Sequence, residues 1–227
     1  MAFTLEKVVP WGRSFDEYLA MFALAEEDLR KRILGCGDGP ASFNCMMKRR
    51  GGRAVSVDPL YRFSAVEIRN RIDEIYEEIM EQTRKNKNEF VWRHISSVEE
   101  LGKVRMDAMN DFLSDYRAGS KEGRYVDASL PMLPFEDREF DIALCSHFLF
   151  LYSERLSDNF HIQSIKELCR VASEVRIFPL LELGAKKSRH LETVIDRLEN
   201  DGFVIDIKKV SYEFQRGGNE MLRVTAA

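Results

Sequence analysis

Short apolar runs alternate with longer amphipathic stretches along this chain. The apolar runs predict strands at residues 32–34, 54–57, 124–126, 141–146 and 175–179. Strands that alternate with helices in this way pair in parallel. The pattern therefore predicts an α/β protein built as a three-layer sandwich, with a mostly parallel sheet and helices on both of its faces.

The C-terminal part of the chain follows a different pattern. Residues 203–210 alternate, with Phe203, Ile205 and Ile207 on one side of an extended segment and Asp206 and Lys208 on the other. A polar, glycine-containing turn at 215–219 precedes a last apolar strand at 220–225. Two consecutive strands joined by such a turn pair antiparallel, so we expect a seven-stranded sheet that ends in an antiparallel hairpin.

Three amphipathic helices begin at the capping-box pattern Ser-x-x-Glu. They start at Ser14, Ser64 and Ser97, each followed three residues later by a glutamate. Apolar residues recur behind each serine at intervals of three or four, which indicates a face directed toward the core. These residues are Phe15, Leu19 and Phe22 in the first helix, Ile68, Ile72, Ile75 and Ile79 in the second, and Leu101, Val104, Ala108 and Phe112 in the third.

The segment lengths indicate a single domain over residues 1–227 with two additions. A βαβ unit needs about 30 residues, and the helical region at 64–118 is longer than one crossover, so it includes an insertion between the second and third strands. This insertion either covers the mouth of a ligand site or lies on a distant surface. Residues 1–30 precede the first strand, and we expect them to form an N-terminal helical lid; ordinary packing on the core is the alternative.

Residues 33–40 carry the most informative motif, an apolar run that ends in Gly35, Gly37 and Gly39 and is followed by Pro40. A strand that turns into a helix at glycines exposes backbone N–H groups to a ligand. Twenty-one residues after Gly37, Asp58 ends the second strand, where such folds bind a nucleoside ribose. Pro40 replaces the third glycine of the dinucleotide fingerprint, and no Gly-Lys-Ser/Thr follows as in a P-loop. The pattern predicts a nucleoside site that does not prefer NAD.

Four motifs occur here in the order typical of class I S-adenosylmethionine-dependent methyltransferases, and the chain resembles that family from about residue 30 to its C-terminus. The motifs are residues 34–39, Val57-Asp58, Asp127-Ala128 and residues 140–144. In the family, the glycine loop lies against the methionine part of the cofactor. The acid after the second strand holds the ribose, and the acid after the third holds the adenine amino group.

The resemblance thus implies S-adenosyl-L-methionine as cofactor and a Rossmann-like fold. The chain also resembles uncharacterised bacterial methyltransferase-like proteins, which indicate no substrate. Carried over residue by residue, the cofactor-binding positions are Gly35, Cys36, Gly37, Asp38, Gly39, Asp58, Pro59, Leu60, Asp127, Ala128, Ser129, Cys145 and Ser146.

The end of the strand at 141–146 faces the methyl group in that family, so His147 is the candidate general base. The alternative is a hydrogen-bonded histidine that lines the adenosine pocket. Asp38 would contact the methionine amine or cap the following helix. Arg13 would pair with the cofactor carboxylate, or stay in solvent beside a packed Trp11. We expect the remaining histidines at the surface: His94, His161 and His190.

The charge balance and the missing motifs restrict the partners. The net charge is −4, whereas broad nucleic-acid binding needs a basic face. The one basic cluster, residues 48–50 with Arg53, is typical of a helix C-terminus. The strand end also lacks both the Asp/Asn-Pro-Pro-aromatic motif of nucleobase amine methyltransferases and the Pro-Cys of enzymes acting on pyrimidine carbon 5. Nucleic acid is therefore disfavoured as a substrate.

The four cysteines match no zinc or iron–sulfur spacing, so we expect no metal. Cys36 and Cys145 fall at strand ends on the ligand side, where each either packs and lines the cofactor or serves as a nucleophile. The N-terminus lacks a secretion signal, and no apolar run approaches the ~18 residues of a membrane span. We expect reduced thiols in a cytoplasmic protein that does not enter a membrane.

These features together predict an S-adenosylmethionine-dependent methyltransferase that transfers a methyl group to a small-molecule acceptor by in-line displacement. Positioning alone can contribute ~7–11 kcal/mol to such a reaction, so the lack of a catalytic triad does not count against an enzyme. Two alternatives remain: a non-catalytic S-adenosylmethionine-binding regulatory protein or complex subunit, and a protein or RNA methyltransferase. The sequence leaves the acceptor and the oligomeric state open.

Overall fold

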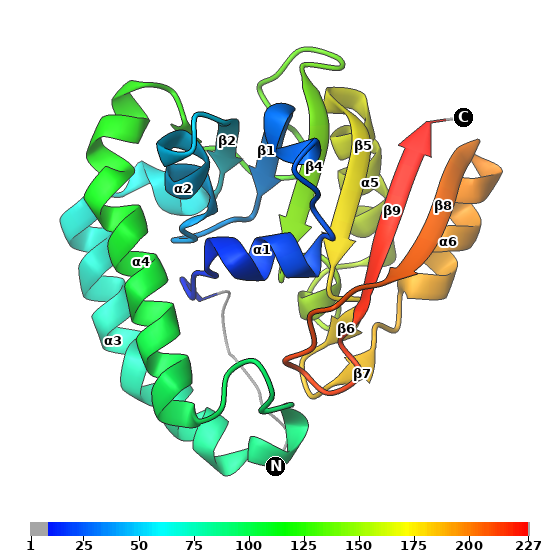
Figure 1. The fold of residues 1–227 in the computed structure, drawn as a ribbon. Helices are drawn as coiled ribbons and strands as arrows, with labels where there is room; N and C mark the ends of the chain where they lie inside the picture. Colours follow the sequence, from blue (N-terminus) through cyan, green and yellow to red (C-terminus); the bar gives the residue numbers. More distant parts are fainter. Residues whose placement is uncertain (1–8, 227) are drawn as a thin grey trace.

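The computed structural model describes residues 9–226 and contains a twisted seven-stranded sheet (Figure 1). The strand order is β3-β2-β1-β4-β5-β9-β8, in which the first five strands are parallel and β9 and β8 are antiparallel to their neighbours. The strands are β1 (Arg32–Cys36), β2 (Arg53–Val57), β3 (Tyr125–Val126), β4 (Phe140–Ser146), β5 (Ala172–Phe178), β8 (Phe203–Lys209) and β9 (Glu220–Ala226). The predicted sheet and its terminal hairpin are confirmed.

Neighbouring residues of the central strands pack into two separate cores, one on each face of the sheet. Ile33 of β1 joins the core beneath α1 (Phe15–Met21) and α2 (Phe43–Arg49), whereas Leu34 joins the core beneath α5 (Asp158–Val171) and α6 (Leu191–Asn200). Side chains alternate across a strand, so a parallel strand that is apolar at successive positions is covered on both faces. The molecule therefore has the predicted three layers.

The long connection between β2 and β3 forms a helical hairpin of α3 (Ala65–Lys85) and α4 (Val98–Lys121). Helix α4 packs against α2, and the hairpin lies at one edge of the molecule (Figure 1). Ile68 and Ile72 of α3 pack on Met109 and Phe112 of α4 in a third core. This core reaches Tyr125, so the hairpin is anchored to the edge strand β3.

The predicted helix starts are present with one variation. Ser14 and Ser64 form complete capping boxes with Glu17 and Glu67. At Ser97 the side chain accepts from the Glu100 N–H, but the Glu100 carboxylate accepts from Ser96 instead.

Two sequence expectations about burial are wrong. In α4 the position facing the core is Arg105, whereas Val104 is only half-buried. The Arg105 side chain is buried in an ion pair with Glu17. His161 is fully buried, with one ring nitrogen beside the Leu149 carbonyl and the other beside the Ser157 carbonyl. A short hairpin of β6 (Leu181–Glu182) and β7 (Lys186–Lys187) was not anticipated.

Within residues 9–226, no helix is both long and apolar enough to cross a lipid bilayer.

Candidate functional site

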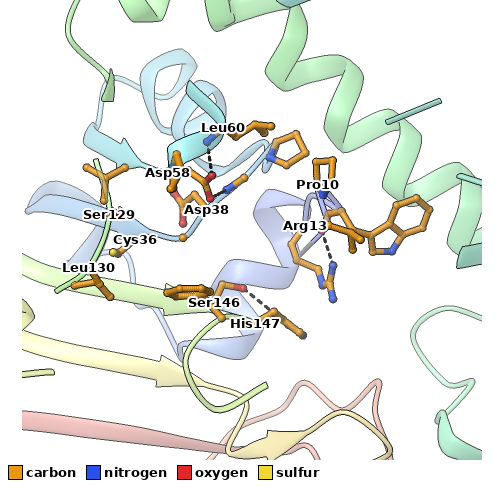
Figure 2. Close-up of a pocket in the computed structure, with 18 of the residues that line it drawn as sticks. Pro10, Arg13, Cys36, Asp38, Asp58, Leu60, Ser129, Leu130, Ser146 and His147 are labelled. Atoms are coloured by element: carbon orange, nitrogen blue, oxygen red, sulfur yellow. Dashed lines mark hydrogen bonds between the residues drawn. The ribbon is translucent and has the colours of Figure 1, made fainter. Parts of the chain in front are cut away.

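A pocket of about 350 Å³ opens at the carboxyl ends of β1, β2 and β4 (Figure 2). Parallel α/β sheets bind ligands at this edge, where the loops after successive strands meet. Helix α3 and the residues before α1 also border the pocket. Of the predicted site residues, the pocket is lined by Arg13, Cys36, Gly37, Asp38, Gly39, Asp58, Pro59, Leu60, Ala128, Ser129, Ser146 and His147. Gly35, Asp127 and Cys145 do not line it.

The glycine loop needs its glycines for three different reasons. Gly37 and Gly39 have φ values of +67° and +53°, a region that glycine enters without strain. A Cβ on Gly37 would also lie 3.1 Å from the Phe148 side chain. Gly35 lies below the pocket, where a Cβ would come within 1.8 Å of an Asp38 carboxylate oxygen. Gly35 therefore makes room for Asp38.

Asp38 turns its carboxyl group inward, beneath the loop. It accepts hydrogen bonds from the Tyr18 hydroxyl (2.7 Å) and the Ser56 hydroxyl (2.6 Å). Burial raises the pKa of Asp38 to about 6, against the lowering effect of these two donors. It does not cap α2, whose N-cap is Ser42. Asp38 therefore joins α1 and β2 to the glycine loop.

Asp58 links the glycine loop to the loop after β2. Its two carboxylate oxygens accept from the backbone N–H groups of Gly39 (2.9 Å) and Leu60 (2.8 Å), as Figure 2 shows for Leu60. Burial raises its pKa despite these bonds. Pro59 begins the short 3-10 helix η2 (Pro59–Arg62) that follows. A carboxylate oxygen can accept more than one hydrogen bond, so Asp58 keeps acceptor capacity toward the pocket.

Asp127 lies at the rim of the site. Its half-exposed carboxylate pairs with Arg62 at 3.3 Å, while the next two residues, Ala128 and Ser129, line the pocket. The guanidinium of Arg71 stands 5.7 Å from the centre of the Phe63 ring at the same rim. The sequence motifs did not predict a role for Arg62 or Arg71, because both residues lie in the helical region between the second and third motifs.

The cysteines at the strand ends are not activated thiols. Burial raises the pKa of Cys36 well above its ordinary value and that of Cys145 to about 12. Cys145 is fully buried in the core beneath α5 and does not line the pocket. Both residues fit the packing interpretation, and Cys145 is misplaced among the predicted pocket residues.

His147 follows β4 directly and turns the chain at a φ of +51°. Its backbone N–H donates to the Phe178 carbonyl (2.7 Å), and its ring Nδ1 lies 2.9 Å from the Ser146 hydroxyl. Burial lowers the pKa of His147 well below its ordinary value, and the charges of Arg13 and Arg105 lower it further. The imidazole is therefore neutral near pH 7.

Residues 9–13, here called the N-terminal segment, pass directly over the glycine loop. The Ser42 N–H donates to the Arg13 carbonyl (3.0 Å), and a Cβ on Gly12 would lie 2.1 Å from the Pro40 carbonyl oxygen. The Arg13 side chain donates to the Trp11 carbonyl (2.7 Å) and extends toward the loop that carries His147 (Figure 2).

The structure differs from the lid predicted at 1–30, because α1 packs in the core and does not cover the pocket as a separate lid. Helix α1 is built into the core, where Phe15 and Tyr18 stack on Phe43 and Phe22 meets Phe178. Only the N-terminal segment borders the pocket, and residues 1–8 lie outside the described residues. The helical region at 64–118 also borders it, through Arg71. Between residues 9 and 226, no three His, Cys, Asp or Glu side chains are grouped as metal ligands.

This architecture and strand order define the fold of the class I S-adenosylmethionine-dependent methyltransferases. The structure is similar to magnesium protoporphyrin IX methyltransferase from Synechocystis PCC 6803 with bound SAH, the demethylated cofactor product. The two are 14% identical, the match covers 94% of this chain and 81% of that chain, and the TM-score is 0.50. No protein-family model matches the chain.

A curated relative defines the family more narrowly. The chain is 35% identical over 219 residues to the uncharacterized protein MJ0045 of Methanocaldococcus jannaschii, and the match covers 96% of each protein. The chain belongs to the same family as this archaeal protein.

Proposed function

We propose that this protein is an S-adenosylmethionine-dependent methyltransferase that acts on a small molecule. The observation that carries the proposal is the pocket at the sheet's carboxyl edge, where the glycine loop, Asp58 and His147 come together. A fold alone does not define an activity, so the assignment depends on the residues of this pocket. The similar Synechocystis structure contains SAH.

The pocket residues fit the parts of the cofactor. Asp58 lies where it can accept from the ribose hydroxyls, and the bends at Gly37 and Gly39 let the methionine part approach the main chain. Asp127 would reach the adenine amino group from the rim, beside Ala128 and Ser129. Arg13 would pair with the cofactor carboxylate.

The cofactor supplies an electrophilic methyl group on a sulfonium. The acceptor's lone pair forms the new bond to carbon as the carbon–sulfur pair returns to sulfur, and a proton on the acceptor leaves to a base. Neutral His147 can accept that proton, with its ring oriented by Ser146. The N-terminal segment and α3 border the pocket, where they would limit the access of water to the reacting atoms.

A small acceptor is favoured by how the pocket is bordered. The N-terminal segment borders the pocket on one side, and η2 and α3 border it on the other. A protein or RNA methyltransferase and a non-catalytic cofactor-binding subunit are the two other candidates. Transfer of methyl from labelled cofactor to a small-molecule extract, and none to protein or RNA, distinguishes all three.

Binding of the cofactor is the direct test. Calorimetry with S-adenosylmethionine, SAH and NAD should show binding of the first two and none of the third at the same concentration. A protein that binds NAD more tightly than SAH would refute the proposal. The matched control is Asp58→Asn, which keeps the side chain's size but places an amide where an acceptor is needed, and should bind SAH at least tenfold more weakly.

A further inference from the structure

A second cavity adjoins the pocket at His147. It has a volume of about 90 Å³, and it shares five lining residues with the pocket: Val9, Trp11, Arg13, His147 and Tyr152. Its remaining walls are mostly apolar and come from α3, α4 and the turn between them, from the short helix after β4, and from the loops that follow β6 and β8. They include Ile79, Leu101, Leu151, Leu183 and Phe214.

Besides Arg13, which lines both cavities, the charged side chain of Arg105 of α4 lines this one. Its side chain is 1% exposed, and its Nη1 binds the Glu17 carboxylate at 2.5 Å. Its Nε and Nη2 are also buried, and neither makes a hydrogen bond of normal geometry among the described residues. Burial lowers the pKa of Arg105, but the Glu17 carboxylate and the Tyr212 hydroxyl, which interacts with this guanidinium, both raise it. The Nε–H and Nη2–H groups form one edge of the planar guanidinium and point the same way, so these donors act as a pair.

The same edge binds carboxylates elsewhere in this protein. Arg189 holds both oxygens of Glu182 through Nε (2.9 Å) and Nη2 (3.0 Å). Arg170 holds Glu167 in the same way, at 2.9 Å for each bond. A two-oxygen anion therefore matches the buried edge of Arg105 in shape and charge.

Among the described residues, the carboxylate that pairs with Arg105 is Glu17, and it does not bind the Nε–Nη2 edge. Glu17 accepts from Arg105, from the Tyr212 hydroxyl (2.7 Å) and from the Ser14 N–H (2.9 Å). Arg13 adds a second, half-buried guanidinium, whose Nε has no hydrogen-bond partner among the described residues. Two cations thus face one carboxylate. The cofactor carboxylate proposed above would pair with Arg13, so the edge of Arg105 is left for a second anion, and buried donors without an acceptor cost free energy.

We propose that the methyl acceptor is a hydrophobic carboxylic acid whose carboxylate binds the Nε–Nη2 edge of Arg105 in the second cavity. The apolar walls would hold the body of the molecule, and its nucleophilic atom would lie past His147 in the pocket. Gln215, whose Oε1 is buried without a partner in the same cavity, would accept from a donor on the ligand. This proposal rests on the proposed function, since it names the acceptor of that reaction.

The test uses benzoate as a probe of the full-length protein, with benzamide as its neutral isostere. Both are titrated by calorimetry into wild-type protein, with and without saturating SAH. Benzoate should bind at least tenfold more tightly than benzamide. Equal affinities would overturn the proposal and leave ordered water as the partner of Arg105. Tighter binding of phenyl phosphate than of benzoate would overturn the carboxylate assignment.

The matched variant is Arg105→Lys, which keeps the charge beside Glu17 but removes the two-donor edge. Benzoate affinity should fall at least tenfold, while SAH affinity and the melting temperature of the SAH complex stay close to wild type. Arg189→Lys removes the same edge from a surface pair and should leave benzoate binding unchanged. Unchanged benzoate affinity in Arg105→Lys would refute the site, and the wild-type comparison with benzamide stands even if that variant does not fold.

The two proposals fail separately in this design. If SAH does not bind, the proposed function is wrong, although benzoate can still be measured on the cofactor-free protein. If SAH binds and benzoate does not, the cofactor site stands and the acceptor is not a carboxylic acid.

Discussion

At the scale of single residues, two carboxylates connect the glycine loop to segments that are distant from it in the sequence. Asp38 joins the loop to Tyr18 of α1 and Ser56 of β2, and Asp58 joins it to η2. Each carboxylate therefore determines where the loop lies as well as what it can bind. Substitutions here should change ligand affinity and stability together.

Asp58→Ala should weaken SAH binding by more than tenfold and lower the free energy of unfolding. Hydrogen bonds to a charged group contribute about 1.5–3 kcal/mol each, and the two backbone donors that Asp58 satisfies would lose their acceptor. Calorimetry and urea denaturation measure the two effects.

Asp127→Ala is the comparison, and its effect on SAH binding should be smaller. The Asp127 carboxylate is half-exposed at the rim and already paired with Arg62. A greater loss of affinity in Asp127→Ala than in Asp58→Ala would reverse the two assignments.

Asp38 should make stability depend on pH in a defined window. Burial raises its folded-state pKa to about 6, above the ordinary value of 3.8. The folded state therefore binds the proton more tightly than the unfolded state, and the contribution of Asp38 to the free energy of unfolding falls as pH rises from about 4 to about 6. The total fall corresponds to about 3 kcal/mol and is complete above that range.

Asp38→Asn isolates this contribution, because an amide can accept from Tyr18 and donate to Ser56 without titrating. Urea denaturation at steps from pH 4.5 to pH 7.5 should show the variant gaining stability relative to wild type as pH rises. Parallel curves for the two proteins would show that the Asp38 carboxyl does not have a raised pKa.

At the scale of elements, two segments outside the conventional βα units complete the site. The N-terminal segment crosses the glycine loop, and the α3–α4 hairpin borders the pocket through Arg71 and the second cavity through Arg105. The hairpin is fastened to the sheet by its own core and by the Arg49–Asp111 pair between α2 and α4. The position of Arg105 therefore depends on how rigidly the hairpin docks.

Gly12→Ala should displace the N-terminal segment from the glycine loop. Its Cβ would lie 2.1 Å from the Pro40 carbonyl oxygen, and since that atom is backbone, the segment itself must move. We expect SAH to bind several-fold more weakly and to dissociate faster, as stopped-flow fluorescence can measure. Gly202→Ala is the control, because its φ of +88° imposes strain but no atom lies within 4 Å of the added Cβ. Equal effects of the two variants would show that the segment does not influence binding.

At the scale of the whole molecule, the pocket joins the sheet edge, α1 and the hairpin, so ligand binding should stabilise the protein as a unit. At one hundred times its dissociation constant, SAH should raise the free energy of unfolding by about 2.7 kcal/mol. For a domain of this size that corresponds to a rise in melting temperature of about 5–10 °C. Differential scanning fluorimetry should show this rise with SAH and none with NAD, and no shift with SAH would contradict the assigned pocket.

The order of elements was determined by the sequence itself. Apolar runs bounded by glycine, proline and capping serines are local signals, and they predicted the seven strands of the main sheet and the starts of α1, α3 and α4. The glycine loop and Asp58 were also predictable, because a sharp turn and a strand-end acid depend on a few adjacent residues. The missed β6–β7 pair is only two residues per strand, too short to carry a pattern.

Only the tertiary structure decided which side chains meet in the site. Gly35 lies in a predicted motif and Cys145 directly follows one, but neither lines the pocket, because the residues that border a pocket depend on which segments pack around the strand ends. Arg105 occupies an apolar-stripe position of α4 and is buried only because Glu17, 88 residues earlier, lies opposite it. A charge buried by a distant partner has no local sequence signature, since its stability depends on contacts between segments far apart in the chain.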